Sequence, residues 1–572
     1  METAEHRIWR DRIWASVLAG LLLLPFVHKA FHLDDTLFLI AAEQIARAPM
    51  DFYGSDVNWY GTTMRMANVM KNPPLASYYI AVAMSWFGAS EIALHLAFLI
   101  PAMALAVGTL ELARRFCRRP MMAVGIALLS PSVWVSSTNV MCDTMMAAFW
   151  AWSVVLWLNG VDRNRLRLMV MGATLAALAA LTKYFGMGLI PLLAAYALLR
   201  TRRLGRWVTA LILPVAILGI YQGYTYALYG RGLLLDAAQY ATSERPADSP
   251  LAWSALIGLC FAGGGMAPVL FIAPWLWNKR GLTAGGVLLV ALTGWFVLMA
   301  PQGMPPGSSA LPALGGGVNW LLVAQCAVWT ATGIGIGVLG VGEVVRSRQA
   351  DVLLLGLWMA GTFVFAAFVN WTVNVRSLLP MAPAVAVIVS RRLERLQAAA
   401  AALPSSSSAG PATAAPLSPG LWTALGTAAA LALAVTWADY TVAGAARNAA
   451  TRLAVRYGTP GKALWFQGHW GFQFYMQRLG ALPLDGENPA IRPGEICVIP
   501  LNNTNIHPPP PEAAQRMATE MEPVCRWAST MCGLPAGAGF YSNLWRPLPF
   551  AFSRIPPEPY WILRATGPEA PH

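Results

Sequence analysis

The chain has 572 residues, of which 57% are hydrophobic and 12% are charged, and its mean hydropathy is +0.51. Because soluble domains carry about 25% charged residues, this composition excludes a soluble globular protein and predicts many membrane spans. The net charge of +13 does not indicate a nucleic-acid partner, because the basic residues stand in short clusters between apolar runs, as topology signals do.

The fold class expected is mainly α: a polytopic transmembrane helical bundle, followed by a small C-terminal α/β domain outside the membrane. About thirteen apolar runs have the length that a bilayer crossing requires. They lie near residues 12–31, 91–113, 120–138, 141–159, 168–182, 184–199, 207–227, 251–276, 282–300, 318–342, 352–371, 376–390 and 421–441. No small-residue cleavage site ends the first run, so we expect no cleavable signal peptide.

The basic clusters alternate with these runs and predict the topology. With the N-terminus on the cytoplasmic face, that face also receives the clusters within 114–119, 163–167, 200–206, 279–280, 346–348 and 391–395. Basic residues are sparse in the loops on the other side, as the positive-inside rule requires. Loop 32–90 and the chain after about residue 445 are therefore expected on the outer face.

Loop 32–90 begins with two adjacent carboxylates, Asp34 and Asp35, at the end of the first span. Charged groups at a membrane boundary are costly to desolvate and often functional; the alternative is a simple helix cap. Residues 36–47 have apolar side chains at helical spacing, which predicts an amphipathic helix at the membrane interface. The loop continues to Lys71 and Pro73-Pro74-Leu75, and residues 76–88 form a second predicted helix.

Three charged residues farther along the chain fall at span ends on this same face. They are Asp143, Lys183 and Arg376. Each has a plainer explanation: Asp143 as a helix N-cap, and Lys183 and Arg376 as basic side chains that reach the interface. Lys71 is equally compatible with an ordinary loop charge.

The chain divides into a membrane core (1–400), a Pro/Ser/Ala-rich linker (401–420), a last span (421–444) and a small soluble domain (445–572). In that domain, 464–480 reads as a strand that runs into a helix, and 495–501 reads as a second strand. The seven cysteines have no metal-ligand spacing. A disulfide bond between Cys525 and Cys532 stays open, provided that the C-terminal domain is in an oxidising compartment.

The ordered set of motifs resembles the GT-C superfamily of glycosyltransferases, above all its protein O-mannosyltransferase and lipid A aminoarabinose transferase members. The resemblance covers about residues 30–390. It departs at Asp35, Asn72 and His95, where the family usually has Glu, Lys and Arg. The residues that stand at the motif positions of the family, with Asp35 in place of Glu, are Asp34-Asp35, Phe38, Ala42, Pro73-Pro74-Leu75, Phe87-Gly88-Ala89-Ser90-Glu91, Leu96, Asp143, Leu181-Thr182-Lys183 and Arg376-Ser377-Leu378-Leu379-Pro380.

The resemblance implies a membrane enzyme that takes a sugar from a polyprenyl phosphate and transfers it to a hydroxyl, with inversion. Asp34 is then the base and Asp35 orients the acceptor or the sugar. Lys71, Asp143, Lys183 and Arg376 bind the donor phosphate or the substrate. No cofactor or metal is implied, although a divalent cation is left open. The acceptor is a lipid, a glycan or a protein hydroxyl, the surrounding partners are membrane lipids, and the location is a bacterial inner membrane with a periplasmic outer face.

Two other functions remain open at this point. A transporter or flippase is one, but such proteins usually show inverted repeats and polar residues at mid-membrane depth, and we find no repeat here. A relative that keeps the fold and has lost catalysis is the other, because of the substitutions at Asp35 and Asn72.

Overall fold

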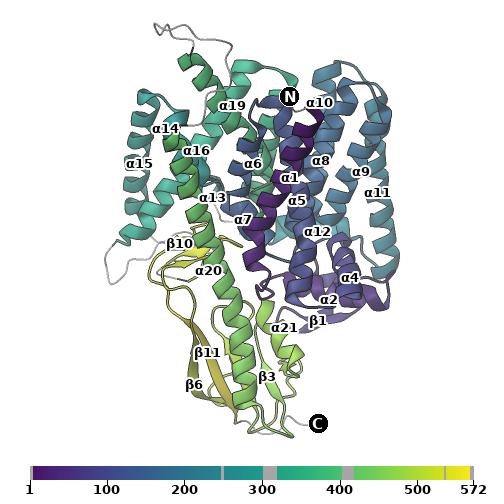
Figure 1. The fold of residues 1–572 in the computed structure, drawn as a ribbon. Helices are drawn as coiled ribbons and strands as arrows, with labels where there is room; N and C mark the ends of the chain where they lie inside the picture. The colour runs from purple at the N-terminus through teal and green to yellow at the C-terminus, as the bar shows by residue number, and fades with distance from the viewer. Residues whose placement is uncertain (1–3, 246–249, 300–317, 402–417, 534–535, 567–572) are drawn as a thin grey trace.

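The computed structural model describes residues 4–245, 250–299, 318–401, 418–533 and 536–566. The chain forms a helical bundle with a small strand-containing domain at one end (Figure 1), so the predicted fold class is confirmed. We call that end of the bundle the domain end and the other the far end. Nearly all of the predicted linker 401–420 lies outside the described residues.

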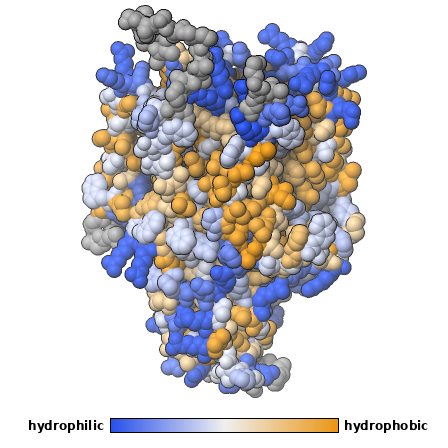
Figure 2. Space-filling view, in the orientation of Figure 1, coloured by the Kyte–Doolittle hydropathy of each residue, from blue (hydrophilic) through white to orange (hydrophobic). Residues whose placement is uncertain are grey.

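Every predicted span falls on helix. The bundle helices are α1 (Ala4–Leu23), α5 (Glu91–Phe116), α6 (Pro120–Leu128), α7 (Pro131–Ser137), α8 (Cys142–Asp162), α9 (Leu166–Thr182), α10 (Leu189–Thr201), α11 (Arg206–Tyr229), α13 (Leu251–Gly265), α14 (Pro268–Leu276), α15 (Lys279–Met299), α16 (Trp320–Ser347), α17 (Ala350–Val364), α18 (Val375–Leu378), α19 (Ala382–Ala401) and α20 (Pro419–Tyr457). On the face drawn in Figure 2, an apolar band crosses the bundle between a hydrophilic far end and a domain of mixed polarity.

Fewer helices than the predicted thirteen are long and apolar enough to cross a membrane. Within the described residues there are 8, or up to 10 if α6–α7 and α13–α14, which bend by 65° and 86°, each count as one span. Three of the thirteen predicted spans, those at α1, α9 and α19, are not among these candidate membrane-crossing helices. Helices α1 and α19 contain several charged residues, and α9 has only 17 residues.

Ion pairs place several helix ends together at the far end. Arg115, at the end of α5, is 2.5 Å from Asp162 at the end of α8 and 2.8 Å from Asp351 at the start of α17. Arg200, at the end of α10, is 2.9 Å from the same Asp162. The predicted alternation of helix direction holds for these spans.

The first loop folds against the domain end. Its elements are α2 (Asp35–Arg47), β1 (Asp56–Asn58), β2 (Thr63–Arg65), α3 (Met66–Val69) and α4 (Leu75–Phe87), so both helices predicted in the loop are confirmed. Helix α2 packs against α4 and against the domain helix α21 (Trp470–Arg478). Its buried face includes Leu37, Phe38, Ala41 and Ile45, the i, i+4 spacing that the sequence shows.

The C-terminal domain contains a five-stranded mixed sheet in the order β4-β3-β5-β11-β6. The predicted strand and helix at 464–480 appear as β3 and α21, and the predicted strand at 495–501 appears as β5. All seven cysteines are free and buried, so Cys525 and Cys532 do not pair. The strand bounds are β3 Leu464–Phe466, β4 Leu482–Pro483, β5 Ile496–Pro500, β6 Ala514–Glu522 and β11 Glu558–Ala565.

Helix α20 has 39 residues and runs from the bundle into the domain, so the last helix ends at Tyr457 rather than near 444. The reason is that its final turns bury Ala449, Ala450 and Leu453 in the domain core. Between these positions stand polar residues, so hydropathy alone does not reveal the extension.

Polar contacts fix the domain to the bundle. Glu91, at the start of α5, is in contact with Arg447 of α20 and with the hydroxyl of Tyr475 on α21. Gly471 lies so close to Phe31 that an added Cβ would be 2.0 Å from its carbonyl oxygen. The two parts are therefore packed backbone to backbone beside the start of the first loop.

A buried ion pair lies at the same junction. Lys29 Nζ is 2.5 Å from Asp439 Oδ2, and neither side chain is exposed. Lys29 also donates to Asn139 Oδ1 at 2.6 Å. Asp439, on α20, accepts hydrogen bonds from Thr530 at 2.6 Å and from the hydroxyl of Tyr541 at 2.9 Å. This pair links the segment after α1, the loop before α8, α20 and the C-terminal domain.

Replacing Lys29 should destabilise the protein strongly. Lys29→Met leaves Asp439 as a buried charge without its cation, which costs about 3–5 kcal/mol of unfolding free energy. Thermal unfolding of the purified protein in detergent measures the effect. Arg456→Ala removes a pair with Glu520 in which the arginine side chain is 60% exposed; it is the control and should cost less than about 1 kcal/mol. Equal losses in the two variants would contradict a structural role for the buried pair.

Candidate functional site

Four of the six predicted site residues meet at the domain end, as a chain of alternating charges. Lys183 Nζ is 2.5 Å from Asp143 Oδ1. Arg376 Nη1 is 3.8 Å from Asp143 Oδ2, and Arg376 Nη2 is 3.0 Å from Asp34 Oδ2. The order is therefore Lys183, Asp143, Arg376, Asp34. We call these residues the charge chain.

Each member is held by the end of a helix. Asp143 stands in the first turn of α8, where the helix dipole favours a carboxylate. Lys183 follows the last residue of α9 in an extended conformation. Arg376 lies in the short helix α18, whose cap residue Asn374 accepts a hydrogen bond from Ser377 N at 2.8 Å. Asp34 is the residue before α2.

The exposed fraction differs among the side chains of the charge chain: it is lowest at Asp143 and highest at Asp34. The Asp143 side chain is 1% exposed, Lys183 18% and Arg376 14%, whereas Asp34 is 32% exposed. Asp143 is thus a buried anchor for two cations, and Asp34 is the carboxylate of the group that a bound molecule can reach most easily.

Asp35 differs from its neighbour. It is fully buried, and its two carboxylate oxygens accept hydrogen bonds from the backbone N–H groups of His32 at 2.8 Å and of Val140 at 2.9 Å. Burial raises its pKa from 3.8 to about 7, against the opposing effect of these two hydrogen bonds. Just before it, Leu33 has φ +49°, a strained conformation for a bulky residue. Asp35 therefore ties the turn before α2 to the loop before α8.

The structure does not bring Lys71 into the charge chain. Lys71 Nζ is 2.6 Å from Asp236 Oδ2 and lies over the ring of Tyr240 at 5.3 Å. Both partners belong to α12 (Leu233–Ser243). Lys71 thus fastens the first loop to α12.

Three further residues, Tyr541, Asp439 and His32, lie next to the charge chain or contact its neighbours, and the sequence analysis did not predict them. The guanidinium carbon of Arg376 is 5.1 Å from the ring centre of Tyr541, and Tyr541 in turn hydrogen-bonds Asp439. His32 Nε2 is 3.8 Å from Asp439 Oδ1, and burial lowers the pKa of His32 to about 4. The available signal was Asp439 itself, because an acid within an apolar run is a functional or structural marker.

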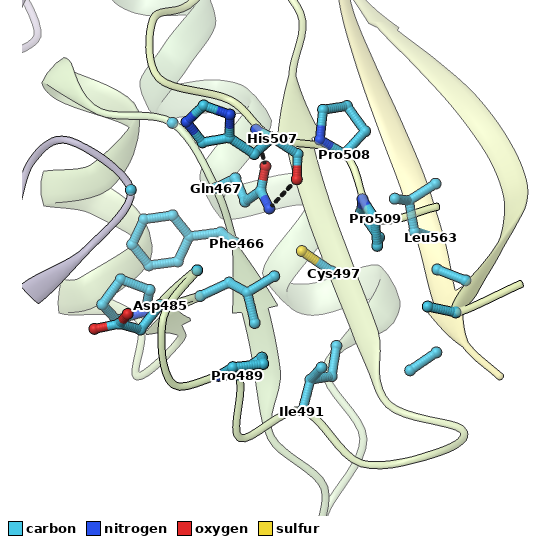
Figure 3. Close-up of a pocket in the computed structure, with 18 of the residues that line it drawn as sticks. Phe466, Gln467, Asp485, Pro489, Ile491, Cys497, His507, Pro508, Pro509 and Leu563 are labelled. Carbon is cyan, nitrogen blue, oxygen red and sulfur yellow. Dashed lines mark hydrogen bonds between the residues drawn. The ribbon is translucent and has the colours of Figure 1, made fainter. Parts of the chain in front are cut away.

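No metal site stands out: within the described ranges, no group of three or more His, Cys, Asp or Glu side chains is placed to hold an ion. A cavity of about 430 Å³ lies in the C-terminal domain, apart from the charge chain. Figure 3 shows apolar side chains such as Phe466, Ile491 and Leu563 around it. Gln467 and the backbone of His507 hydrogen-bond each other at 2.8 Å in both directions.

The comparisons with known proteins now bear on this arrangement. Residues 71–222 match the family model described as dolichyl-phosphate-mannose-protein mannosyltransferase. The resemblance to the GT-C glycosyltransferases is confirmed. The matched segment includes Lys71, Asp143 and Lys183, while Asp34 and Arg376 lie outside it. No match was found among curated proteins.

Two solved structures match this chain at low sequence identity. ArnT from Cupriavidus metallidurans, bound to undecaprenyl phosphate, has 16% sequence identity and a TM-score of 0.42, and the alignment covers 87% of this chain and 94% of ArnT. The archaeal oligosaccharyltransferase AglB from Archaeoglobus fulgidus, in complex with an inhibitory peptide and a dolichol-phosphate, has 12% identity and a TM-score of 0.46. That alignment covers 84% of this chain and 64% of AglB.

Asp35→Asn should destabilise the protein, because one of the two backbone N–H groups would face an amide N–H₂. An unsatisfied buried donor costs about 1–3 kcal/mol. The loss should also depend on pH. Native Asp35 keeps its proton up to about pH 7, whereas the unfolded chain loses it near 3.8, so the stabilisation that wild type has over Asp35→Asn should shrink as pH rises through this window.

Melting temperatures of both proteins between pH 4 and pH 8 test this. Asp56→Asn is the matched control, because the side chain of Asp56 is 54% exposed. A difference between wild type and Asp35→Asn that grows with pH would refute the buried, protonated state.

Proposed function

We propose that the protein transfers a sugar from a polyprenyl-phosphate donor to a hydroxyl acceptor at the domain end of the bundle. The observation that carries this proposal is the charge chain, which sets an accessible carboxylate 3.0 Å from a guanidinium that is itself backed by Asp143 and Lys183. The match of residues 71–222 to a family of lipid-phosphate sugar transferases supports the same reaction.

In the proposed reaction, the acceptor hydroxyl attacks the anomeric carbon while the bond from that carbon to the phosphate oxygen breaks. The new glycosidic bond takes the electron pair of the acceptor oxygen, and the proton passes to the carboxylate of Asp34. The electron pair of the broken bond leaves with the lipid phosphate. With a single base and no second carboxylate equally exposed in the charge chain, direct displacement with inversion is the outcome we infer.

The cations of the charge chain have a separate task. Charge builds up on the departing phosphate, and preorganised cations stabilise it. Arg376 suits this role because its planar guanidinium can hold two phosphate oxygens at once. Asp143 holds Arg376 and Lys183 in place, and Asp35 fixes the turn that presents Asp34, so we assign positioning roles to both carboxylates.

The distribution of charge supports an orientation. The basic clusters at the far end favour the cytoplasmic face for that end, so the proposal puts the domain end and the C-terminal domain on the periplasmic side of a bacterial inner membrane. A polyprenyl phosphate would lie with its chain in the bilayer and its phosphate at the depth of the charge chain. The acceptor would approach from the side of the C-terminal domain.

Asp34→Asn should lower the rate of sugar transfer by about 10²–10⁴-fold, the usual contribution of a general base. Transfer of radiolabelled sugar from a panel of polyprenyl-phosphate sugars in membranes measures it, with melting temperature as the check on folding. Full activity in a folded Asp34→Asn variant would remove Asp34 from the role of base.

Two further substitutions test which basic residue binds the donor phosphate. Arg376→Lys keeps the charge but loses the two-point contact with phosphate, so we expect kcat to fall by about tenfold or more. Lys71→Ala should change kcat by less than about threefold, because Lys71 pairs with Asp236 instead of the charge chain. The reverse order of effects in the same transfer assay would return Lys71 to the phosphate site.

A further inference from the structure

A polar cavity of about 450 Å³ lies on the C-terminal domain, distinct from the apolar cavity of Figure 3. Four side chains give it its character: Asn502, Trp545, Arg546 and Glu558. They come from the loop after β5, the first residue of β11 and the segment 541–546. None of them was predicted as a site residue.

These groups match a sugar ring on both of its sides. A pyranose has an apolar C–H face, which the flat indole of Trp545 can cover, and a rim of hydroxyls that donate and accept. Asn502 and Glu558 offer both functions and are joined by a hydrogen bond of 2.8 Å from Asn502 Nδ2 to Glu558 Oε1.

Two of the lining residues carry an unpaired donor. Trp545 Nε1 and Arg546 Nε have no hydrogen-bond partner among the described residues, and both atoms are buried beside the cavity and not open to it. Buried polar atoms are almost always paired, so a small rotation of these side chains on glycan binding would pair both donors with its oxygens. The apolar cavity of Figure 3 offers a contrast, because Gln467 and the backbone of His507 already satisfy each other there.

The rim of the cavity disfavours an extended peptide. Pro556, Pro557 and Pro559 line one side, and proline has no backbone N–H. A peptide that binds by strand addition needs such donors, whereas a glycan is recognised by side chains.

The cavity is connected with the charge chain in two ways. Asn502 and Glu558 also line a narrow gap that reaches His32 and Trp470, and the backbone N–H of His32 binds Asp35, beside the base. In the other direction, the segment 541–546 runs from Tyr541, under Arg376, to the cavity itself.

We propose that this cavity binds the glycan portion of the acceptor and so directs its hydroxyl toward Asp34. The proposal rests on the proposed function and adds that the acceptor is a glycan, whether free or linked to a lipid. It gives the C-terminal domain a direct part in acceptor choice.

Glycan binding can be measured without any transfer. Saturation-transfer difference NMR of the full-length protein, in a detergent without a sugar headgroup, would use maltotriose, mannotriose and chitotriose as probes. At least one should bind, and Trp545→Ala and Asn502→Ala should each weaken it by about tenfold or more. Trp527→Ala, an exposed tryptophan of the same domain, is the matched control and should change the affinity by less than about twofold.

Glu558→Gln guards against a folding artefact, because it keeps the shape of the side chain. It should also weaken trisaccharide binding, while Glu512→Gln, at an exposed position, should not. An octyl glycoside of the same sugar distinguishes the sources of the glycan: equal affinity indicates recognition of the glycan alone, and a gain of about tenfold or more indicates a lipid-linked acceptor.

Binding should persist in Asp34→Asn, which separates this proposal from the proposed reaction. Failure of transfer with intact trisaccharide binding would count against the donor or the base and would leave the glycan site standing. The absence of binding by all three trisaccharides, or undiminished binding in both Trp545→Ala and Asn502→Ala, would overturn the glycan site. Binding of a serine/threonine peptide in place of the trisaccharides would overturn it as well.

Discussion

Charge that is buried at the domain end must be paired, and this constraint organises the rest of the structure. The desolvation of an isolated ion inside a protein costs several kcal/mol, so Asp143, which is 1% exposed, holds both Lys183 and Arg376. Lys29 and Asp439, which contact the charge chain through Tyr541, are 2.5 Å apart and fully buried. Each pair joins segments that are distant in the sequence, so the pairing of charges also determines how helices, loop and domain meet.

The C-terminal domain is part of this arrangement. Its residue Tyr541 lies under Arg376 and hydrogen-bonds Asp439. The helix α21 contacts the turn before α2 so closely that Gly471 has no room for a side chain. A glycan held beside Trp545 would therefore contact segment 541–546, the same segment whose Tyr541 lies against Arg376. Recognition of the acceptor and stabilisation of the leaving phosphate would then share one rigid support.

The two adjacent carboxylates show how neighbours in sequence acquire different tasks. Asp34 precedes α2 and is 32% exposed, whereas Asp35, one residue later, is buried and bound by two backbone N–H groups. The helix turns the second side chain toward the loop before α8 and leaves the first beside Arg376. From the resemblance, Asp34 was expected as the base and Asp35 as the group that orients the acceptor or the sugar. The burial of Asp35 was not predicted, because adjacency in sequence does not reveal where each side chain points.

The sequence by itself determined what depends on local pattern. Apolar runs gave the helices, basic clusters gave their alternation, and motif order pointed to Asp34, Asp143, Lys183 and Arg376. It did not determine which cations pair with which carboxylates: Lys71 belongs with Asp236, and Lys29 with Asp439, 410 residues away along the chain. Only the tertiary structure decided these pairings, because the energy of an ion pair depends on distance and burial in space, and neither is a property of sequence position.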